Sequence, residues 1–289
     1  MAPSAELVAL VDKIPPLDSK DYKPPLLKTR PSTGKFTGPT WAEAEKIIEP
    51  ILKGGTKSLV GVIDMLQEVD DGTDYKARYV LHAIAQYACR ADKQEAQDLM
   101  IDALAGALDG RPVEIQKFLL QQLRVCGDGR LAKRLGKLLT NEKLCDRAAL
   151  ALTAIKTGAV EQFRAALGKA TGRCRLVALQ NLGVLGDKGS VGAFRKAATD
   201  TDVDIRVTAV WALADLGDAE SVDVVLKAAG SKNWERVRAV KACLLLAEKL
   251  AAAGKKDDAK KIYTHLRDTR TDKSENYVRQ VATKALEAL

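Results

Sequence analysis

A repeat of about 30 residues constrains the fold of this chain more than any other feature. Anchor residues at positions 116, 145, 175, 206 and 236 lie 29 to 31 residues apart, and similar anchors stand at 78 and 279. Mostly small or aliphatic residues follow each anchor at spacings of 3, 6, 7 and 10. The clearest set follows Arg206 and comprises Ala209, Ala212, Leu213 and Leu216. These spacings place the side chains on one face of an α-helix, so each unit begins with an amphipathic helix.

A turn signal follows most of these helices at the same phase of the repeat. The dipeptides are Gly127-Asp128, Gly186-Asp187 and Gly217-Asp218. Glycine can end the first helix in a left-handed conformation, and aspartate can cap a second helix. A second apolar helix is then expected, as in Val222, Val225 and Leu226. One such helix–turn–helix unit cannot bury its apolar face alone, so neighbouring units must stack.

This pattern resembles the HEAT-repeat family, and most closely the short HEAT-like units of phycobilisome lyases. The stretch from Arg206 to Asp218 follows the signature RxxAxxALxxLGD of those units. The resemblance covers roughly residues 75–289 and is strongest from 171 to 247. It implies an all-α, right-handed α-solenoid of stacked antiparallel helix pairs, in which the second helices line the concave face. It is specific for fold but poor for function, because scaffolds, lyase subunits and DNA-repair proteins all use such units.

The resemblance also assigns a structural role to the repeat arginines, which brace one unit against the next in this family. They are Arg78, Arg175, Arg206, Arg236 and Arg279. Two units depart from the pattern, with Gln116 and Cys145 at the anchor. For these two units the bracing role is in doubt.

The first 40 residues differ from the rest of the chain. They contain seven of the nine prolines, so we expect an arm at 1–40, with residues 15–39 too proline-broken for helix. The arm is either a tethered linker or a tail that docks a partner. Thr40 and Glu43 form a capping box that predicts a helix start. We therefore expect a HEAT-like solenoid over 41–289, with a divergent capping repeat at 41–74 made of helices 41–52 and 56–68.

The bulk composition indicates a soluble, helical protein. The chain is 46% hydrophobic but only 4% aromatic, and its formal net charge is +8. A mild excess of basic residues allows an acidic partner without requiring one. No apolar run is long enough to span a membrane, so no membrane insertion is expected. The first residues lack a basic leader, which favours a cytoplasmic protein; export after removal of a leader stays an alternative.

The residues that usually carry chemistry are scarce. His82 and His265 are the only histidines, and no HExxH or CxxC motif is present. The glycine–lysine pieces at 32–35 and 54–58 lack Walker spacing, and the aspartates at 70, 71 and 74 form an incomplete calcium loop. We therefore expect no catalytic residues, no cofactor and no metal. The five cysteines favour buried, reduced thiols, although Cys145 and Cys174 could form a cross-repeat disulfide in an exported protein.

A basic stripe is expected on the second helices. Lys137, Lys196 and Lys227 share one register position, and Arg164 and Arg195 share the position before it. The full stripe comprises Lys133, Arg134, Lys137, Arg164, Arg195, Lys196, Lys227, Lys260 and Lys261. It could be an ordinary solvated face or a groove for an acidic peptide or a phosphate backbone.

Trp211 is a second candidate contact. It lies five residues after its anchor, where other units carry Gln121, Gln180, Lys241 and Lys284, so we expect it to be at least partly exposed. It is either an interface hot spot or a filler against the next repeat. By contrast, Trp41 and Trp234 lie near helix starts and are expected to be packing residues.

The sequence favours a non-catalytic scaffold that binds a partner protein or acidic peptide on the concave surface. The alternatives are a nucleic-acid-binding protein similar to HEAT-like DNA glycosylases and, on repeat type alone, a subunit of a chromophore lyase. A terminal unit with a single helix also leaves open a homodimer formed through the C-terminal edge.

Overall fold

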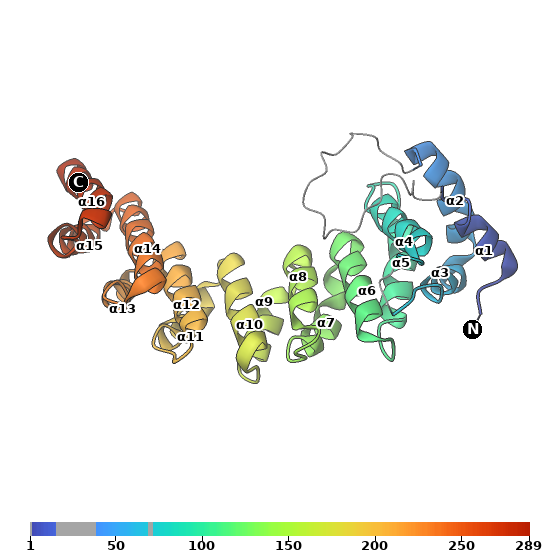
Figure 1. Cartoon of the computed structure of the whole chain (residues 1–289), viewed down its shortest axis with the longest axis horizontal. Helices are drawn as coiled ribbons and strands as arrows, with labels where there is room; N and C mark the ends of the chain where they lie inside the picture. The colour runs from blue at the N-terminus through green and yellow to red at the C-terminus, as the bar shows by residue number, and fades with distance from the viewer. Residues whose placement is uncertain (1, 16–38, 69–71) are drawn as a thin grey trace. The chain divides into compact units, whose positions relative to one another are not determined.

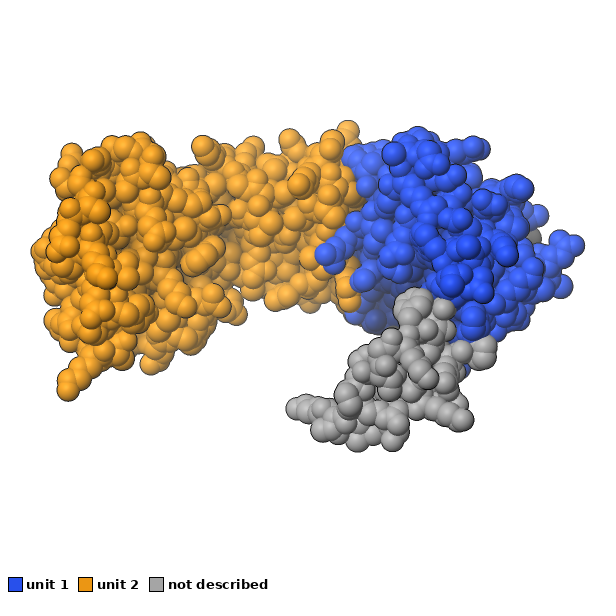
Figure 2. All heavy atoms as spheres, turned by 90° about the horizontal axis from the view of Figure 1, so that it is seen from above, with its two compact units in different colours: residues 1–131 blue, residues 132–289 orange. Residues whose placement is uncertain are grey.

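The computed structural model describes residues 2–15, 39–68 and 72–289, and over these residues it is all-α. Most of the proline-rich arm (residues 16–38), which includes the glycine–lysine piece at 32–35, lies outside the described residues, as do the aspartates at 70 and 71. The chain forms two compact units, residues 1–131 and 132–289, which Figure 2 colours separately. The expected all-α architecture of helix pairs is confirmed within each unit.

The described residues of unit 1 form six α-helices and one short 3-10 turn. The α-helices are α1 (Ala5–Val11), α2 (Trp41–Lys53), α3 (Gly55–Ile63), α4 (Tyr75–Ala88), α5 (Gln94–Gly106) and α6 (Val113–Cys126), and the turn is η1 (Gly129–Leu131). The capping box is confirmed, because the Thr40 amide donates to Glu43 Oε2 at 2.7 Å and the Glu43 amide donates to Thr40 Oγ1 at 3.4 Å. Helix α1 lies in the part of the chain that we expected to be an arm. It packs on α2, α3 and α4, and Leu7 and Val11 are buried there.

Unit 2 is a run of helix pairs. Its first helices are α8 (Cys145–Ile155), α10 (Gly172–Val184), α12 (Val203–Asp215), α14 (Asn233–Ala252) and α16 (Asn276–Ala288). Its second helices are α7 (Ala132–Leu138), α9 (Ala159–Leu167), α11 (Val191–Ala197), α13 (Val222–Ala228) and α15 (Lys256–Thr269), and the 3-10 turns are η2 (Lys188–Ser190), η3 (Ala219–Ser221) and η4 (Lys273–Glu275). Helices α8, α10, α12 and α14 pack side by side, as Figure 1 shows for this unit.

Small residues on the first helices let neighbouring repeats approach closely. On α12, Ala209 and Leu213 are completely buried, and Ala212 is almost so. The second helices contribute larger side chains to the same core, including Phe163 on α9 and Phe194 on α11, neither of which is exposed. Close packing of this kind fills the space between units with few aromatic residues. The spacing of 3, 6, 7 and 10 therefore marks the buried face, as the sequence predicts.

The left-handed glycine is formed as expected at two of the three Gly-Asp turns, and the aspartate cap is formed at Asp187 but not at Asp218. Gly186 and Gly217 have φ values of +67° and +65°, the left-handed conformation that glycine adopts without strain. Asp187 then accepts a hydrogen bond from the Gly189 amide at 3.2 Å and so caps the turn η2. The expectation is wrong for Gly127, which is extended with φ −69° and ψ 158°. Helix α6 therefore ends there without a left-handed residue.

Three of the four repeat arginines of unit 2, Arg175, Arg206 and Arg236, reach from one repeat to the next. Arg206 donates from Nε and Nη2 to the two carboxylate oxygens of Glu235, both at 2.7 Å, and from Nη1 to the backbone oxygens of Asp200 and Thr201. Arg175 donates to Asp200 at 2.6 Å, and Arg236 donates to Glu275 at 2.9 Å. A bidentate arginine–carboxylate pair fixes both distance and orientation. These contacts have the geometry that a bracing role requires.

All five cysteines are free thiols. Cys145 and Cys174 share one buried cluster with Ala170 and are not bonded to each other, whereas Cys89 is exposed. Burial raises the pKa of the Cys145 thiol to about 12, with a further contribution from a hydrogen bond to Cys174. No helix in the described residues is long and apolar enough to cross a membrane.

Candidate functional site

All nine residues of the basic stripe lie on second helices of unit 2. Lys133, Arg134 and Lys137 are on α7, Arg164 is on α9, Arg195 and Lys196 are on α11, Lys227 is on α13, and Lys260 and Lys261 are on α15. Arg134 is half-buried. Five lysines of the stripe are exposed, namely Lys133, Lys137, Lys196, Lys227 and Lys260. None of these five forms an ion pair with a described residue.

Two arginines of the stripe are engaged by the next repeat. Arg164 donates from Nε to Asp187 Oδ2 at 2.7 Å, and Arg195 donates from Nη2 to Asp218 Oδ2 at 2.6 Å. The acceptors are the aspartates of the Gly-Asp turns, so each turn is held by the second helix of the preceding repeat. The Arg164 guanidinium is the main reason that the pKa of Asp187 lies below its ordinary value. Lys261 also has a partner, because its Nζ lies 2.6 Å from Asp223 Oδ1.

Trp211 lies on a different surface, the one formed by the first helices. It lines a groove with a cavity volume of about 730 Å³. The groove, which we call the first-helix groove, receives residues from α8, α10, α12 and α14. Its apolar part is formed by Leu150, Val184, Val207, Trp211 and Trp234, with Leu176 and Leu179 beneath. A binding surface on this side is separate from the basic stripe on the second helices.

Large apolar side chains are unusually exposed in the first-helix groove. Trp211 is 43% exposed, as its position in the repeat predicts, and Val184 is 74% exposed. Trp234 is 49% exposed, so the expectation that it is a packing residue is wrong. Leu150 is 40% exposed on the same side. Contiguous exposed apolar side chains of this size are typical of interaction sites rather than of ordinary surface.

The charged residues around the groove fall into two groups. Arg173 is paired with Asp146 at 2.6 Å, and Asp215 is paired with Lys249 at 2.7 Å. The side chains of Asp204 and Arg238 form no hydrogen bond or ion pair with the described residues. The groove thus combines an apolar floor with one free carboxylate and one free guanidinium.

Sequence reasoning missed three residues of this groove. Leu150 lies five residues after its anchor, the register position of Trp211, and could have been found by extending that comparison to the Cys145 unit. Val184 lies nine residues after Arg175, where the next unit has Asp215. Trp234 precedes its anchor by two residues, a position that the repeat pattern does not describe. For Leu150 the signal is an apolar residue at a position that is polar in both neighbouring units, whereas Val184 follows Ala154 at the same register and shows no such contrast.

The histidines have structural surroundings. His82 Nδ1 lies 2.9 Å from the amide oxygen of Gln122, and His82 Nε2 lies 3.1 Å from Gln86 Nε2. Burial is the main reason that the pKa of His265 is below its ordinary value. Within residues 2–15, 39–68 and 72–289, no group of three or more His, Cys, Asp or Glu side chains is placed to hold a metal ion.

Comparisons with known proteins agree with the architecture. The family model of HEAT repeats matches residues 160–244. No curated protein matches the chain. Among solved structures, the complex of CpcE and CpcF of phycocyanin lyase from Nostoc sp. PCC7120 is similar, with 15% sequence identity and a TM-score of 0.37, over 84% of this chain and 98% of that chain. Residues 160–244, which run from α9 into α14, therefore match HEAT repeats.

Proposed function

We propose that this protein is a non-catalytic scaffold that binds a segment of a partner protein in the first-helix groove. The observation that carries the proposal is the pair of half-exposed tryptophans, Trp211 and Trp234, in a groove built from four successive first helices. Tryptophan is the residue most enriched at interface hot spots, because it buries a large area at a small cost in side-chain entropy. A repeat array supplies the extended, rigid surface that such binding needs.

The groove is best suited to an amphipathic helix. Its apolar residues come from equivalent faces of neighbouring helices, and a helical ligand presents apolar residues at a comparable spacing. The free Asp204 carboxylate and Arg238 guanidinium can pair with charges at the edge of that helix. Leu150 and Val184 also line the groove and offer contacts for aliphatic side chains. We therefore expect a partner segment with an apolar face flanked by both signs of charge.

Affinity capture with the full chain tests the proposal. The bait is mixed with lysate of its source cells, with and without nuclease, and the bound proteins are quantified by mass spectrometry. A scaffold retains a stoichiometric protein partner after nuclease treatment. Loss of the captured proteins on nuclease treatment would contradict the proposal and would favour nucleic-acid binding instead.

The exposed lysines of the basic stripe support a second contact surface for an acidic partner. Lys196 and Lys227 occupy equivalent positions on α11 and α13, and neither has an acidic partner among the described residues. Long-range attraction of this kind raises association rates and is screened by salt.

We predict that Lys196→Glu combined with Lys227→Glu weakens capture of an acidic partner about ten-fold at low salt. Exposed lysines contribute through the electrostatic potential, so the difference should shrink above about 0.5 M salt, where screening is strong. Lys169→Glu combined with Lys188→Glu is a control with the same change in net charge, made at exposed lysines outside the stripe. Equal loss in both double variants would show that net charge, and not the stripe, is responsible.

A further inference from the structure

The repeat arginines of unit 2 follow one contact rule. Arg175, Arg206 and Arg236 each donate to a carboxylate that lies at or just before the start of the next first helix. The acceptors are Asp200 ahead of α12, Glu235 in the first turn of α14 and Glu275 at the N-terminal end of α16. Three successive repeats therefore use the same arginine position to hold a carboxylate at the start of a neighbouring helix.

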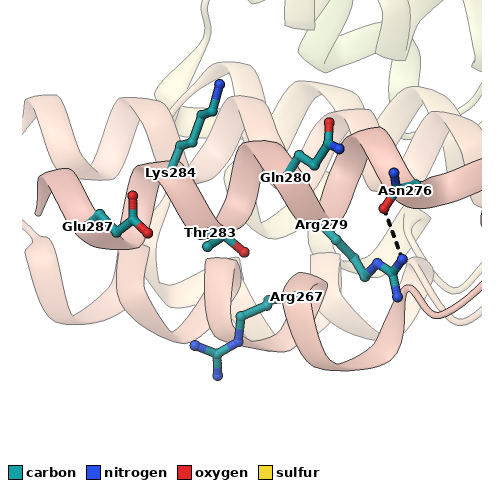
Figure 3. Close-up of a pocket in the computed structure, with 7 residues that line it drawn as sticks. All are labelled: Arg267, Asn276, Arg279, Gln280, Thr283, Lys284 and Glu287. Carbon is teal, nitrogen blue, oxygen red and sulfur yellow. Dashed lines mark hydrogen bonds between the residues drawn. The ribbon is translucent and has the colours of Figure 1, made fainter.

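Arg279 occupies this position on α16 but has a different partner. Its Nη2 donates to the side-chain oxygen of Asn276 at 2.9 Å, within the same helix, as the dashed line in Figure 3 shows. It forms no ion pair with any carboxylate of the described residues. Arg279 as a whole residue is half-buried, like the other repeat arginines of unit 2.

A pocket surrounds Arg279 on the open side of α16. It has a cavity volume of about 470 Å³ and is lined by Arg267 of α15 and by Asn276, Arg279, Gln280, Thr283, Lys284 and Glu287 of α16. Figure 3 shows the labelled side chains of α16 along the helix, with Arg267 on the neighbouring helix α15. Arg267 is paired with Asp268 at 2.7 Å, so Arg279 and Lys284 are the lining cations without an ion pair among the described residues. We call this the α16 pocket.

We infer that the α16 pocket binds a carboxylate in the first turn of a helix of an acidic partner protein. The chain itself shows that an arginine in this register takes a carboxylate at a helix start. Lys284 adds a cation without an ion pair, and Gln280 and Thr283 add hydrogen-bond donors at the side of the pocket. A second copy of the same surface would bring Arg279 and Lys284 against the same two cations, so charge favours a partner with acidic residues.

This inference is independent of the first-helix groove. The groove lies on α8, α10, α12 and α14, whereas the α16 pocket lies on α15 and α16, and no residue lines both. Variants in one surface therefore leave the other unchanged. Failure of one proposal does not entail failure of the other.

Two synthetic alanine-based peptides of about 18 residues, a length at which helices are stable enough to form, test the inference. One carries glutamate at three positions of its first turn, and the other carries glutamine there. Binding of each labelled peptide to the full chain is measured by fluorescence anisotropy at low salt. We expect the glutamate peptide to bind at least ten-fold more tightly, a difference that several charge-assisted contacts can supply.

Variants locate the contact on the chain. Arg279→Gln combined with Lys284→Gln should remove the ten-fold preference for the glutamate peptide. Lys273→Gln combined with Lys256→Gln changes the net charge equally, at exposed residues outside the pocket, and should retain it. Circular dichroism and the thermal midpoint show whether each variant is folded. If Arg279→Gln proves unstable, the exposed Lys284→Gln variant alone should lower the preference about three-fold.

Several results would overturn the inference. The first is equal binding of the two peptides, and the second is an equal loss of preference in the control variant. The third is displacement of the glutamate peptide by inorganic phosphate at the same concentration at which chloride displaces half of it. Concentration-dependent dimerisation in the ultracentrifuge that is abolished by Lys284→Gln would also overturn it, because the pocket would then belong to an interface between copies.

Discussion

Replacing both Trp211 and Trp234 by alanine weakens partner binding about 100-fold and leaves the fold intact. The two side chains are 43% and 49% exposed, so each contributes to the surface more than to the core. Truncating hot-spot tryptophans typically costs 2 kcal/mol or more each, and values for neighbouring hot spots do not add fully. A combined loss of about 3 kcal/mol corresponds to the expected 100-fold change in Kd.

Quantitative capture of the partner across a bait titration measures this change. Trp41→Ala is the matched control, because Trp41 lies in unit 1 with a similar exposure of 40%. The control should bind as tightly as the unaltered protein, and the thermal midpoints of all three proteins should differ by no more than about 3 °C. Undiminished binding by the double variant would remove the groove from the functional account.

The second large effect concerns stability. Arg206→Met removes a bidentate ion pair with Glu235 and two hydrogen bonds to backbone oxygens, and it leaves a partly buried carboxylate without its partner. The Glu235 side chain is 16% exposed, so the remaining charge is poorly solvated. We expect the free energy of unfolding to fall by about 2 kcal/mol. Arg238→Met, at an exposed arginine without an ion pair, should change it by less than about 0.5 kcal/mol.

The pH dependence of this difference follows from the pKa of Glu235. The hydrogen bond from Arg206 is the main reason that this pKa lies below its ordinary value. A carboxylate with a lowered pKa in the folded state stabilises the fold fully above its unfolded pKa, and this contribution is lost as the pH falls through the folded pKa. The stability difference between Arg206→Met and the unaltered protein should therefore be largest at pH 7 and shrink below about pH 4.

Urea unfolding at pH 7 and at pH 3.5 provides the measurement, with circular dichroism as the signal. A difference of equal size at the two pH values would show that Arg206 stabilises the protein by packing rather than by its ion pair. A difference below 0.5 kcal/mol at pH 7 would contradict the bracing role of the repeat arginines.

The repeat could be predicted from the sequence because its signal is local. Ala209, Leu213 and their equivalents lie within one helix, so their spacing alone identifies the buried face. The turns at Gly186 and Gly217 are local for the same reason. Gly127 shows the limit of that reasoning, because an extended residue can also end a helix and the dipeptide does not distinguish the two cases.

The candidate site was harder to predict, because its contacts join residues of different repeats. The sequence predicts a stripe of basic residues on the second helices. In the structure, Arg164 and Arg195 donate hydrogen bonds to aspartates that lie 23 residues further along the chain. The groove depends on which of four helices lie side by side, and its residues Leu150, Val184 and Trp234 share no single register position. Helix α1 was missed because it is short and is followed by a proline-rich stretch.

Photo-crosslinking from the two competing surfaces tests the central claim most directly. A benzoylphenylalanine residue replaces Gln180, which lines the first-helix groove, or Lys196, which lies on the second-helix stripe, and each protein is irradiated in nuclease-treated lysate. The account predicts that position 180 crosslinks to one protein, through a segment with an apolar face, and that Trp211→Ala with Trp234→Ala abolishes the product. Crosslinking from position 196 alone, or a product from position 180 that survives loss of both tryptophans, would contradict it.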